Sequence, residues 1–194
     1  KLPQNILGDF IWAKESEWPS IVGSLGGNKV LIRGNHDPKQ FSASTKRMFQ
    51  EITDLKEIKD SGKHVVMCHY PIPFFRASFA STAFMLYGHV HQTIEYEYIA
   101  KLRREVKANS TGYGTPNGNF INVGCMMPYM DYTPRTLDEI IEGDEGIMKK
   151  IPTLFERVFD TYIARVDDLI STQNQIIFTQ PLGFQEKSGG FFYG

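Results

Sequence analysis

The sequence predicts an α/β fold in which short strands alternate with amphipathic helices. Short apolar runs typical of buried strands recur between segments whose apolar residues follow helical spacing. Alternation of this kind favours a sheet covered by helices. A further observation is chemical, because four of the apolar runs end in Asp, Asn or His. Ligands of open α/β sheets bind at the carboxyl ends of the strands, so the pattern indicates a site there.

The first fifty residues are expected to contain two strands and two helices. Their predicted ranges are a strand over 4–10, a helix over 15–25, a strand over 29–33 and a helix over 38–49. The last helix is expected to use Asp37 as its N-cap and Pro38 at its first position.

The next part of the chain continues the alternation. The predicted elements are a hairpin over 55–69 that turns at Ser61-Gly62, a strand over 82–91, a helix over 92–108, a strand over 120–125 and a helix over 136–141. In the first of these helices, the apolar stripe is expected to be Ile94, Tyr98, Leu102 and Val106, and the solvated face Lys101, Arg103, Arg104 and Lys107. Thr136 and Glu139 fit a capping box at the start of the second.

Composition excludes some classes of partner. The 194 residues suffice for one well-cored domain with an appendage, and 21 basic residues nearly balance 22 acidic ones. This balance gives no global attraction to nucleic acid or an anionic membrane, although a local basic patch stays open. No apolar run approaches the ~20 residues of a membrane helix. Cys68 and Cys125 lie in apolar runs and are expected to be buried, reduced thiols, which favours a cytoplasmic protein.

The polar residues at the strand ends are typical metal ligands. They are Asp9, Asn35, His69, His89 and His91. His89 and His91 are two residues apart, so in extended chain they project to the same side. If the strand ends meet, the five residues form one cluster of oxygen and imidazole donors, which suits Mn²⁺, Fe, Zn²⁺ or Ni²⁺.

Four motifs occur in a specific order. They are "GD" at 8–9, "GNHD" at 34–37, "CHYP" around His69 and "GHVH" at 88–91. In this order, each behind an apolar run, they resemble the calcineurin-like metallophosphoesterases. The stretch over 120–141 is similar to small bacterial and phage members of that family, so the resemblance covers residues 1–142. It implies a two-sheet sandwich flanked by helices and the hydrolysis of a phosphodiester or a phosphomonoester.

The resemblance also implies a role for each metal ligand. Asp9 would bridge two divalent metal ions. Asn35, His69 and His89 would complete the shell of one ion, and His91 would serve the other. The metals would lower the pKa of a bound water, and the resulting hydroxide would attack phosphorus in line.

Three further residues receive roles around the substrate. By the resemblance, His36 would face the phosphoryl group and protonate the leaving oxygen or stabilise the charge there. Asp37 would orient His36. Arg33 is a candidate for binding the substrate phosphate, and a structural role at the strand end is left open beside it.

The chain departs from the family pattern at one point. The family begins with an Asp-x-His motif on its first strand, which supplies ligands to the metal that His91 serves, and this sequence contains no such motif. The second metal site is therefore expected to be incomplete. His64 stands at the start of a strand, where a structural role is expected. An N-terminally truncated chain lacking the first strand is favoured over a degenerate member, and fusion of a strand carrying Asp-x-His is expected to restore activity.

Residues 143–194 form the predicted appendage. It is expected to contain a linker around 143–146, an amphipathic helix over 151–170 and a glycine-rich tail of unknown role. The segment 148–159 is similar to the openings of phage RNA ligases. Two alternatives to an esterase stay open. One is a non-catalytic metal-binding or interaction module that retains the fold, and the other, suggested only by this tail, is an RNA-repair accessory protein.

Overall fold

The computed structural model describes residues 4–112 and 114–149, and the chain divides into two compact units, Lys1–Ile147 and Met148–Gly194. In chain order the described elements are β1 (Gln4–Ile6), a 3₁₀ turn (Glu15–Glu17), α1 (Trp18–Ser24), β2 (Lys29–Ile32), α2 (Ala43–Lys46), β3 (Glu51–Thr53), β4 (Leu55–Asp60), β5 (Lys63–Cys68), β6 (Ala83–Tyr87), α3 (Ile94–Ala108), β7 (Phe120–Asn122) and α4 (Leu137–Met148). The predicted α/β class is confirmed.

The strands form two sheets. One sheet has three parallel strands in the order β1-β2-β3. The other has four strands in the order β4-β5-β6-β7, in which β4 and β5 form the predicted antiparallel hairpin and the remaining pairs are parallel. Asp54 alone separates β3 from β4, so the chain passes from one sheet to the other through one residue.

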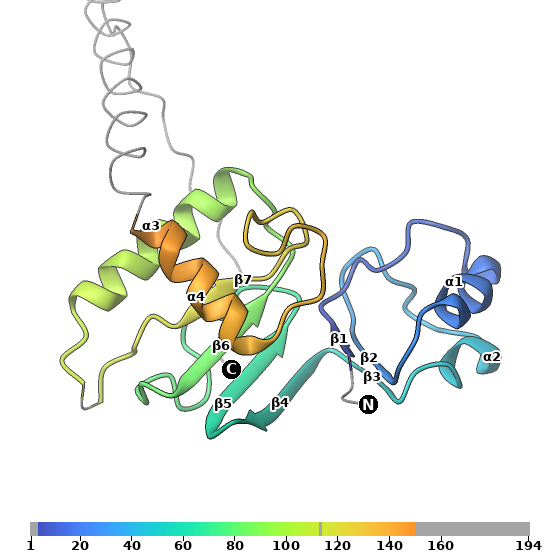
Figure 1. Ribbon diagram of the computed structural model, residues 1–194, viewed down its shortest axis with the longest axis horizontal. Helices are drawn as coiled ribbons and strands as arrows, with labels where there is room; N and C mark the ends of the chain where they lie inside the picture. Colours follow the sequence, from blue (N-terminus) through green and yellow to red (C-terminus); the bar gives the residue numbers. More distant parts are fainter. Residues whose placement is uncertain (1–3, 113, 150–194) are drawn as a thin grey trace, which may run out of the picture. The chain divides into compact units, whose positions relative to one another are not determined.

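The two sheets share a core because β2 is buried on both faces. Val30 and Ile32 belong to a cluster with Val65 of β5 and other residues of the four-stranded sheet and α4, whereas Leu31 packs with Trp18 of α1. Successive strand residues point to opposite faces, so these contacts place β2 between the two groups. Figure 1 shows α1 and α2 beside β1–β3, and α3 and α4 beside β4–β7.

Half of the predicted apolar stripe of α3 is turned away from solvent. Leu102 packs against the core and Val106 is half-buried, as predicted, whereas Ile94 and Tyr98 are exposed. The rest of the buried side is formed by Tyr96, Ile99 and Ala100. Spacing of four residues matched two stripes of this helix equally well. The presence of aromatic and apolar residues on both stripes left the sequence without a means to choose.

Arg103 corrects the prediction of a basic, solvated face on α3. Its guanidinium is buried and binds both carboxylate oxygens of Asp144 on α4, with Nη1 2.6 Å from Oδ1, and its Nε donates to the carbonyl of Gly118. The predicted linker over 143–146 is also wrong, because these residues form the second half of α4. The capping box at its start is confirmed, since the Thr136 backbone N–H donates to the Glu139 carboxylate at 2.7 Å.

The predicted helix over 38–49 is only one turn, α2. Ser42 caps it, accepting from the Thr45 N–H at 3.2 Å. Asp37 does not act as an N-cap because its carboxylate accepts from Gly34, Asp9 and Phe10, as described below. The loop before α2 is therefore fixed by the neighbouring strand ends.

Three further expectations concern the rest of the chain. Among the described residues, no helix combines the length and the apolar character needed to cross a bilayer. Both cysteines are free thiols, but Cys125 is exposed and Cys68 half-buried, so the expectation that both are buried is wrong. The amphipathic helix over 151–170 and the tail lie outside the described residues.

Candidate metal centre

Four side chains from four strand ends meet at one point. Nε2 of His69 lies 3.1 Å from Oδ1 of Asn35, 3.2 Å from Nδ1 of His89 and 3.4 Å from Oδ2 of Asp9. Ligand atoms of Asp9, His69 and His89 all lie within 4.8 Å of one another. The strand ends belong to two sheets rather than to one, so the centre forms where the sheets meet.

The His69 ring is held in the tautomer that a metal requires. Its Nδ1 lies 2.7 Å from the backbone oxygen of Leu7, which follows β1. A carbonyl oxygen only accepts, so Nδ1 must carry the proton. In the neutral ring Nε2 then presents its lone pair to the cluster. A histidine that ligates a metal through one nitrogen commonly donates from the other in this way.

Two glycines allow the loops to approach this closely. A Cβ atom on Gly34 would lie 2.3 Å from Oδ1 of Asp9 and 2.6 Å from its backbone nitrogen. On Gly8, whose φ is 80°, a Cβ would lie 2.5 Å from the Gly34 nitrogen and 2.6 Å from Nδ1 of His69. The glycines of the "GD" and "GNHD" motifs are thus required by packing at the centre itself.

Three of the predicted ligands have left-handed backbones. Asp9, His89 and His91 have φ values of 48°, 51° and 48°. Such a conformation costs a non-glycine residue about 1–3 kcal/mol and persists only where the surrounding structure enforces it. Residues of this kind cluster at functional sites. The backbone strain at these three positions is therefore a feature that functional residues often share.

Asp37 has a different role from the predicted one. Its Oδ2 accepts from the backbone N–H groups of Gly34 at 2.8 Å and Asp9 at 3.1 Å, and its Oδ1 accepts from Phe10 at 3.0 Å. These hydrogen bonds hold backbone groups and do not involve the His36 ring, so they do not support the expectation that Asp37 orients that ring. The buried carboxylate instead joins the loop after β1 to the loop after β2.

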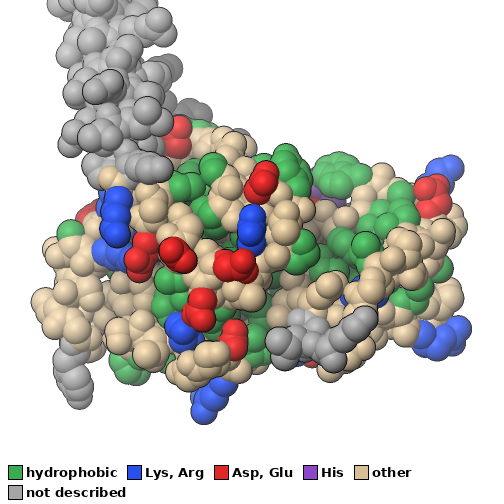
Figure 2. Space-filling view, viewed as in Figure 1, with side chains coloured by type: hydrophobic (Ala, Val, Ile, Leu, Met, Phe, Trp, Pro, Cys, Tyr) green, Lys and Arg blue, Asp and Glu red, His purple; other side chains and the backbone are tan. Residues whose placement is uncertain are grey.

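His36 touches the centre through its backbone. Its N–H donates to Oδ1 of Asp9 at 2.9 Å, which leaves Oδ2 directed to His69. The exposed His36 ring lies against Trp12, with ring centroids 4.4 Å apart and planes inclined by 35°. Figure 2 shows a small area of histidine surface beside hydrophobic side chains, with acidic and basic groups interspersed on the same face.

His91 is not among the close donors Asp9, His69 and His89. Its side chain is exposed, and its backbone oxygen accepts from Nδ2 of Asn122 at 3.0 Å. Its predicted role at the second metal therefore stays a prediction. The pKa of His89 is lowered first by partial burial and second by its electrostatic interaction with His69, with a smaller lowering contribution from His91.

Sequence reasoning missed residues that support the centre. Asn122, which ends β7, is buried, and its Oδ1 accepts from Gly124 at 2.9 Å while its Nδ2 binds the loop that carries His89 and His91. It is a polar residue at a strand end, so the signal that identified the ligands would also have found it. Tyr70 was missed too, and its ring centroid lies 4.6 Å from that of His89.

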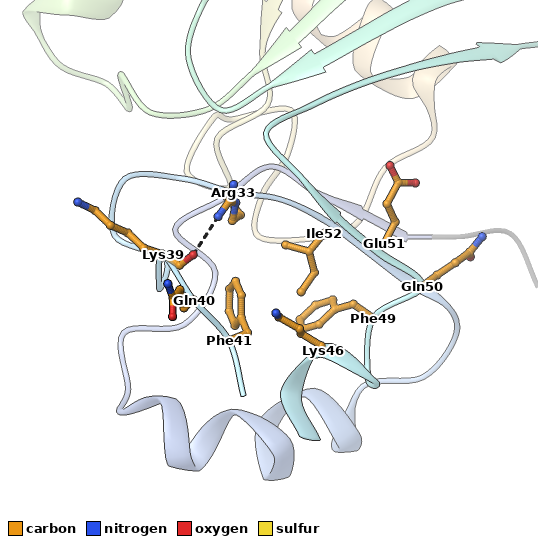
Figure 3. Close-up of a pocket in the computed structure, with 9 residues that line it drawn as sticks. All are labelled: Arg33, Lys39, Gln40, Phe41, Lys46, Phe49, Gln50, Glu51 and Ile52. Atoms are coloured by element: carbon orange, nitrogen blue, oxygen red, sulfur yellow. Dashed lines mark hydrogen bonds between the residues drawn. The ribbon is translucent and has the colours of Figure 1, made fainter. Parts of the chain in front are cut away.

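Arg33 has the structural role that the sequence left open beside substrate binding. Its Nε and Nη2 each lie 2.7 Å from a carboxylate oxygen of Asp54, and its Nη1 donates to the backbone oxygen of Lys39 at 3.1 Å. Figure 3 shows Arg33 at the edge of a pocket of about 410 Å³, toward which Phe41 and Phe49 also point. The guanidinium is occupied by protein partners, so the contacts do not support phosphate binding there.

Comparisons with known proteins add a structural likeness. No family model matches the chain, and a search of curated proteins found no match. The crystal structure of the protein of unknown function AQ665 from Aquifex aeolicus is similar over 72% of this chain and 75% of its own, with 27% sequence identity and a TM-score of 0.46.

Proposed function

We propose that this chain is a metal-dependent phosphoesterase with the calcineurin-like fold. The observation that carries the proposal is the convergence of Asp9, Asn35, His69 and His89 on one point at the ends of four strands. These are the residues that the order of motifs "GD", "GNHD", "CHYP" and "GHVH" selects. The two-sheet architecture is consistent with that fold.

The donor set fits one divalent ion. Carboxylate, amide and imidazole donors suit Mn²⁺, Fe, Zn²⁺ or Ni²⁺, and the fixed tautomer of His69 leaves a lone pair on the inward nitrogen. A bound divalent ion would supply Lewis-acid chemistry to a phosphoryl group and to water. For a second ion, the described residues offer Asp9 and the exposed His91, so the geometry supports one ion and leaves the second without a complete ligand set.

The chain's own residues would orient and protonate the substrate. The His36 N–H holds Oδ1 of Asp9, so Oδ2 faces the metal ligands. The His36 ring is exposed beside the centre, where an imidazole can give a proton to the leaving oxygen. The proposal covers a phosphodiester and a phosphomonoester alike, because the donor set would act on the phosphoryl group that both contain. A reducing, cytoplasmic setting is part of the proposal, in keeping with two free thiols.

Hydrolysis and metal content test this function together. The purified chain would be loaded with Mn²⁺, analysed for metal per chain, and assayed with bis(p-nitrophenyl) phosphate and p-nitrophenyl phosphate. We expect about one ion per chain and Mn²⁺-dependent release of p-nitrophenol, both lost in Asp9→Asn. His64→Gln is the matched control, because His64 lies on β5 with Glu57 as its partner and outside the centre.

Each outcome of that assay has a definite meaning. Activity that survives in Asp9→Asn would come from a contaminant and would contradict the proposal. Tight metal binding without hydrolysis of either ester would favour the non-catalytic metal-binding module. Absence of metal binding by the intact chain would remove both.

A further inference from the structure

The strongest unexplained feature near the centre is an exposed tryptophan. Trp12 is 78% exposed, whereas Trp18, the other tryptophan of the chain, is 0% exposed in the core. Single exposed apolar residues are ordinary. Trp12 differs from an ordinary one because its ring lies against that of His36, the residue proposed to face the phosphoryl group.

Trp12 is held in this place by a fixed loop. Two residues earlier, Phe10 packs edge-on against Trp18, with ring centroids 6.0 Å apart, and its N–H donates to the carboxylate of Asp37. Ile11 also packs against the core cluster around α1. The loop is therefore anchored on the inside immediately before Trp12, and the indole is presented outward at a defined position.

A second exposed aromatic ring borders the centre from the loop after β5. Tyr70 is 44% exposed, and its ring lies against those of His69 and His89. The centre is therefore bordered by an indole at His36 and a phenol ring at His89. Aromatic faces that remain open to solvent beside a phosphoryl site are the means by which proteins bind nucleobases without reading their edges.

We infer that the substrate of this site carries a planar aromatic base close to its phosphoester, as a nucleotide does, and that Trp12 selects it by stacking. The inference rests on the proposed function, since it takes the phosphoryl group to lie at the metal centre. A base joined through a ribose to that phosphate lies over the exposed indole. Phosphoesters without a planar group lack this contact and bind more weakly.

Binding of a matched pair of ligands tests the inference without turnover. The Zn²⁺-loaded chain would be titrated by calorimetry with the non-hydrolysable phosphonate analogues of adenosine 5′-monophosphate and of ribose 5-phosphate, in which CH₂ replaces the ester oxygen. The second of these ligands lacks only the base. We expect the nucleotide analogue to bind on the order of 10-fold more tightly, as one base–aromatic stack implies. Trp12→Ala should remove the difference, and Trp12→Phe should retain part of it.

Fluorescence supplies a second measurement. Trp18 is buried, so quenching of tryptophan emission by the nucleotide analogue, and not by the ribose 5-phosphate analogue, would report stacking on Trp12. Tyr98→Ala is the control, because Tyr98 is an exposed aromatic residue of α3 outside the centre. It should leave both affinities and the quenching unchanged.

The outcomes separate this inference from the proposed function. Equal affinity for the two ligands, or a preference that persists in Trp12→Ala, would overturn the inference even if the chain hydrolyses phosphoesters. Failure of both ligands to bind would overturn it as well. A preference that depends on Trp12 in a chain without hydrolytic activity would uphold the stacking site and contradict the esterase alone.

Discussion

Two clusters of polar side chains, the Arg103–Asp144 pair and the candidate metal centre, join different elements of this molecule in different ways. Arg103 and Asp144 are buried between α3 and α4, carry opposite charges and satisfy each other, with the carbonyl of Gly118 taking a further hydrogen. Around Nε2 of His69, by contrast, the side chains meet chiefly as acceptors.

Under the proposed function, this difference separates polar groups that stabilise the fold from polar groups that would bind a ligand. Burial of a polar group is costly unless it is paired, and the ion pair between the helices is complete without any further partner. Hydrogen-bond acceptors that face one another do not stabilise each other, whereas a cation bound between them would interact favourably with all of them.

The largest expected effect is on the ion pair. Asp144→Ala leaves the buried Arg103 charge without its partner, so the free energy of unfolding should fall by about 3–5 kcal/mol, measured by urea denaturation. Asp138→Ala is the control, because the Lys63–Asp138 pair at 3.0 Å is exposed and its loss should cost ~0–1 kcal/mol. Equal losses of unfolding free energy in the two variants would contradict the claim that the buried pair stabilises the fold more than the exposed pair does.

Gly34→Ala should disturb the metal centre more than the fold. The added methyl group would overlap Asp9, so metal affinity should fall strongly while the free energy of unfolding of the metal-free chain falls by about 1–3 kcal/mol. Gly26→Ala is the matched control, since a Cβ there meets no atom within 4 Å. Unchanged metal binding in Gly34→Ala, measured by calorimetry with Zn²⁺, would contradict the proposed role of this close approach.

The same two regions show how far the sequence predicts the structure. The α/β class, the hairpin and the meeting of polar side chains at the strand ends followed from local patterns, because an apolar strand that ends in Asp9 or His69 is visible in a few residues. The pairing of Arg103 with Asp144 was not predictable, since its members are 41 residues apart and each is typical of a solvated helix face. The true role of Asp37 was likewise set by contacts with another strand end.

Asn122→Ala should have an intermediate effect that connects the fold to the centre. It removes the hydrogen bond to the backbone oxygen of His91, so we expect a loss of about 1–2 kcal/mol in the free energy of unfolding and weaker Zn²⁺ binding through His89. Asn109→Ala removes an exposed hydrogen bond to the Glu105 carbonyl at the end of α3 and should leave Zn²⁺ binding unchanged. Loss of stability without any change in metal binding would show that the loop is held by other contacts.

The smallest expected effect is a pH dependence of the metal-free chain. Burial lowers the pKa of His89 in the folded state below its ordinary value of 6.5. As pH falls below that value, the unfolded chain takes up the proton first, so stability should decrease, whereas at higher pH the contribution is fully present. Urea midpoints measured with EDTA between pH 5 and pH 8 should show a slope that is smaller in His89→Gln. The opposite slope would contradict the burial effect.

The passage from β3 to β4 through Asp54 has a mechanical consequence. One residue spans at most about 3.6 Å, so the edges of the two sheets are tethered with almost no slack. Arg33, which directly follows β2, donates from Nε and Nη2 to the carboxylate of Asp54 and so holds this connection in place. The two halves of the candidate metal centre come from the two sheets, so their side chains are held close together by the fold itself. If the centre binds an ion as proposed, binding would need little further ordering of the chain, because the conformational entropy of assembling the ligands is already lost on folding.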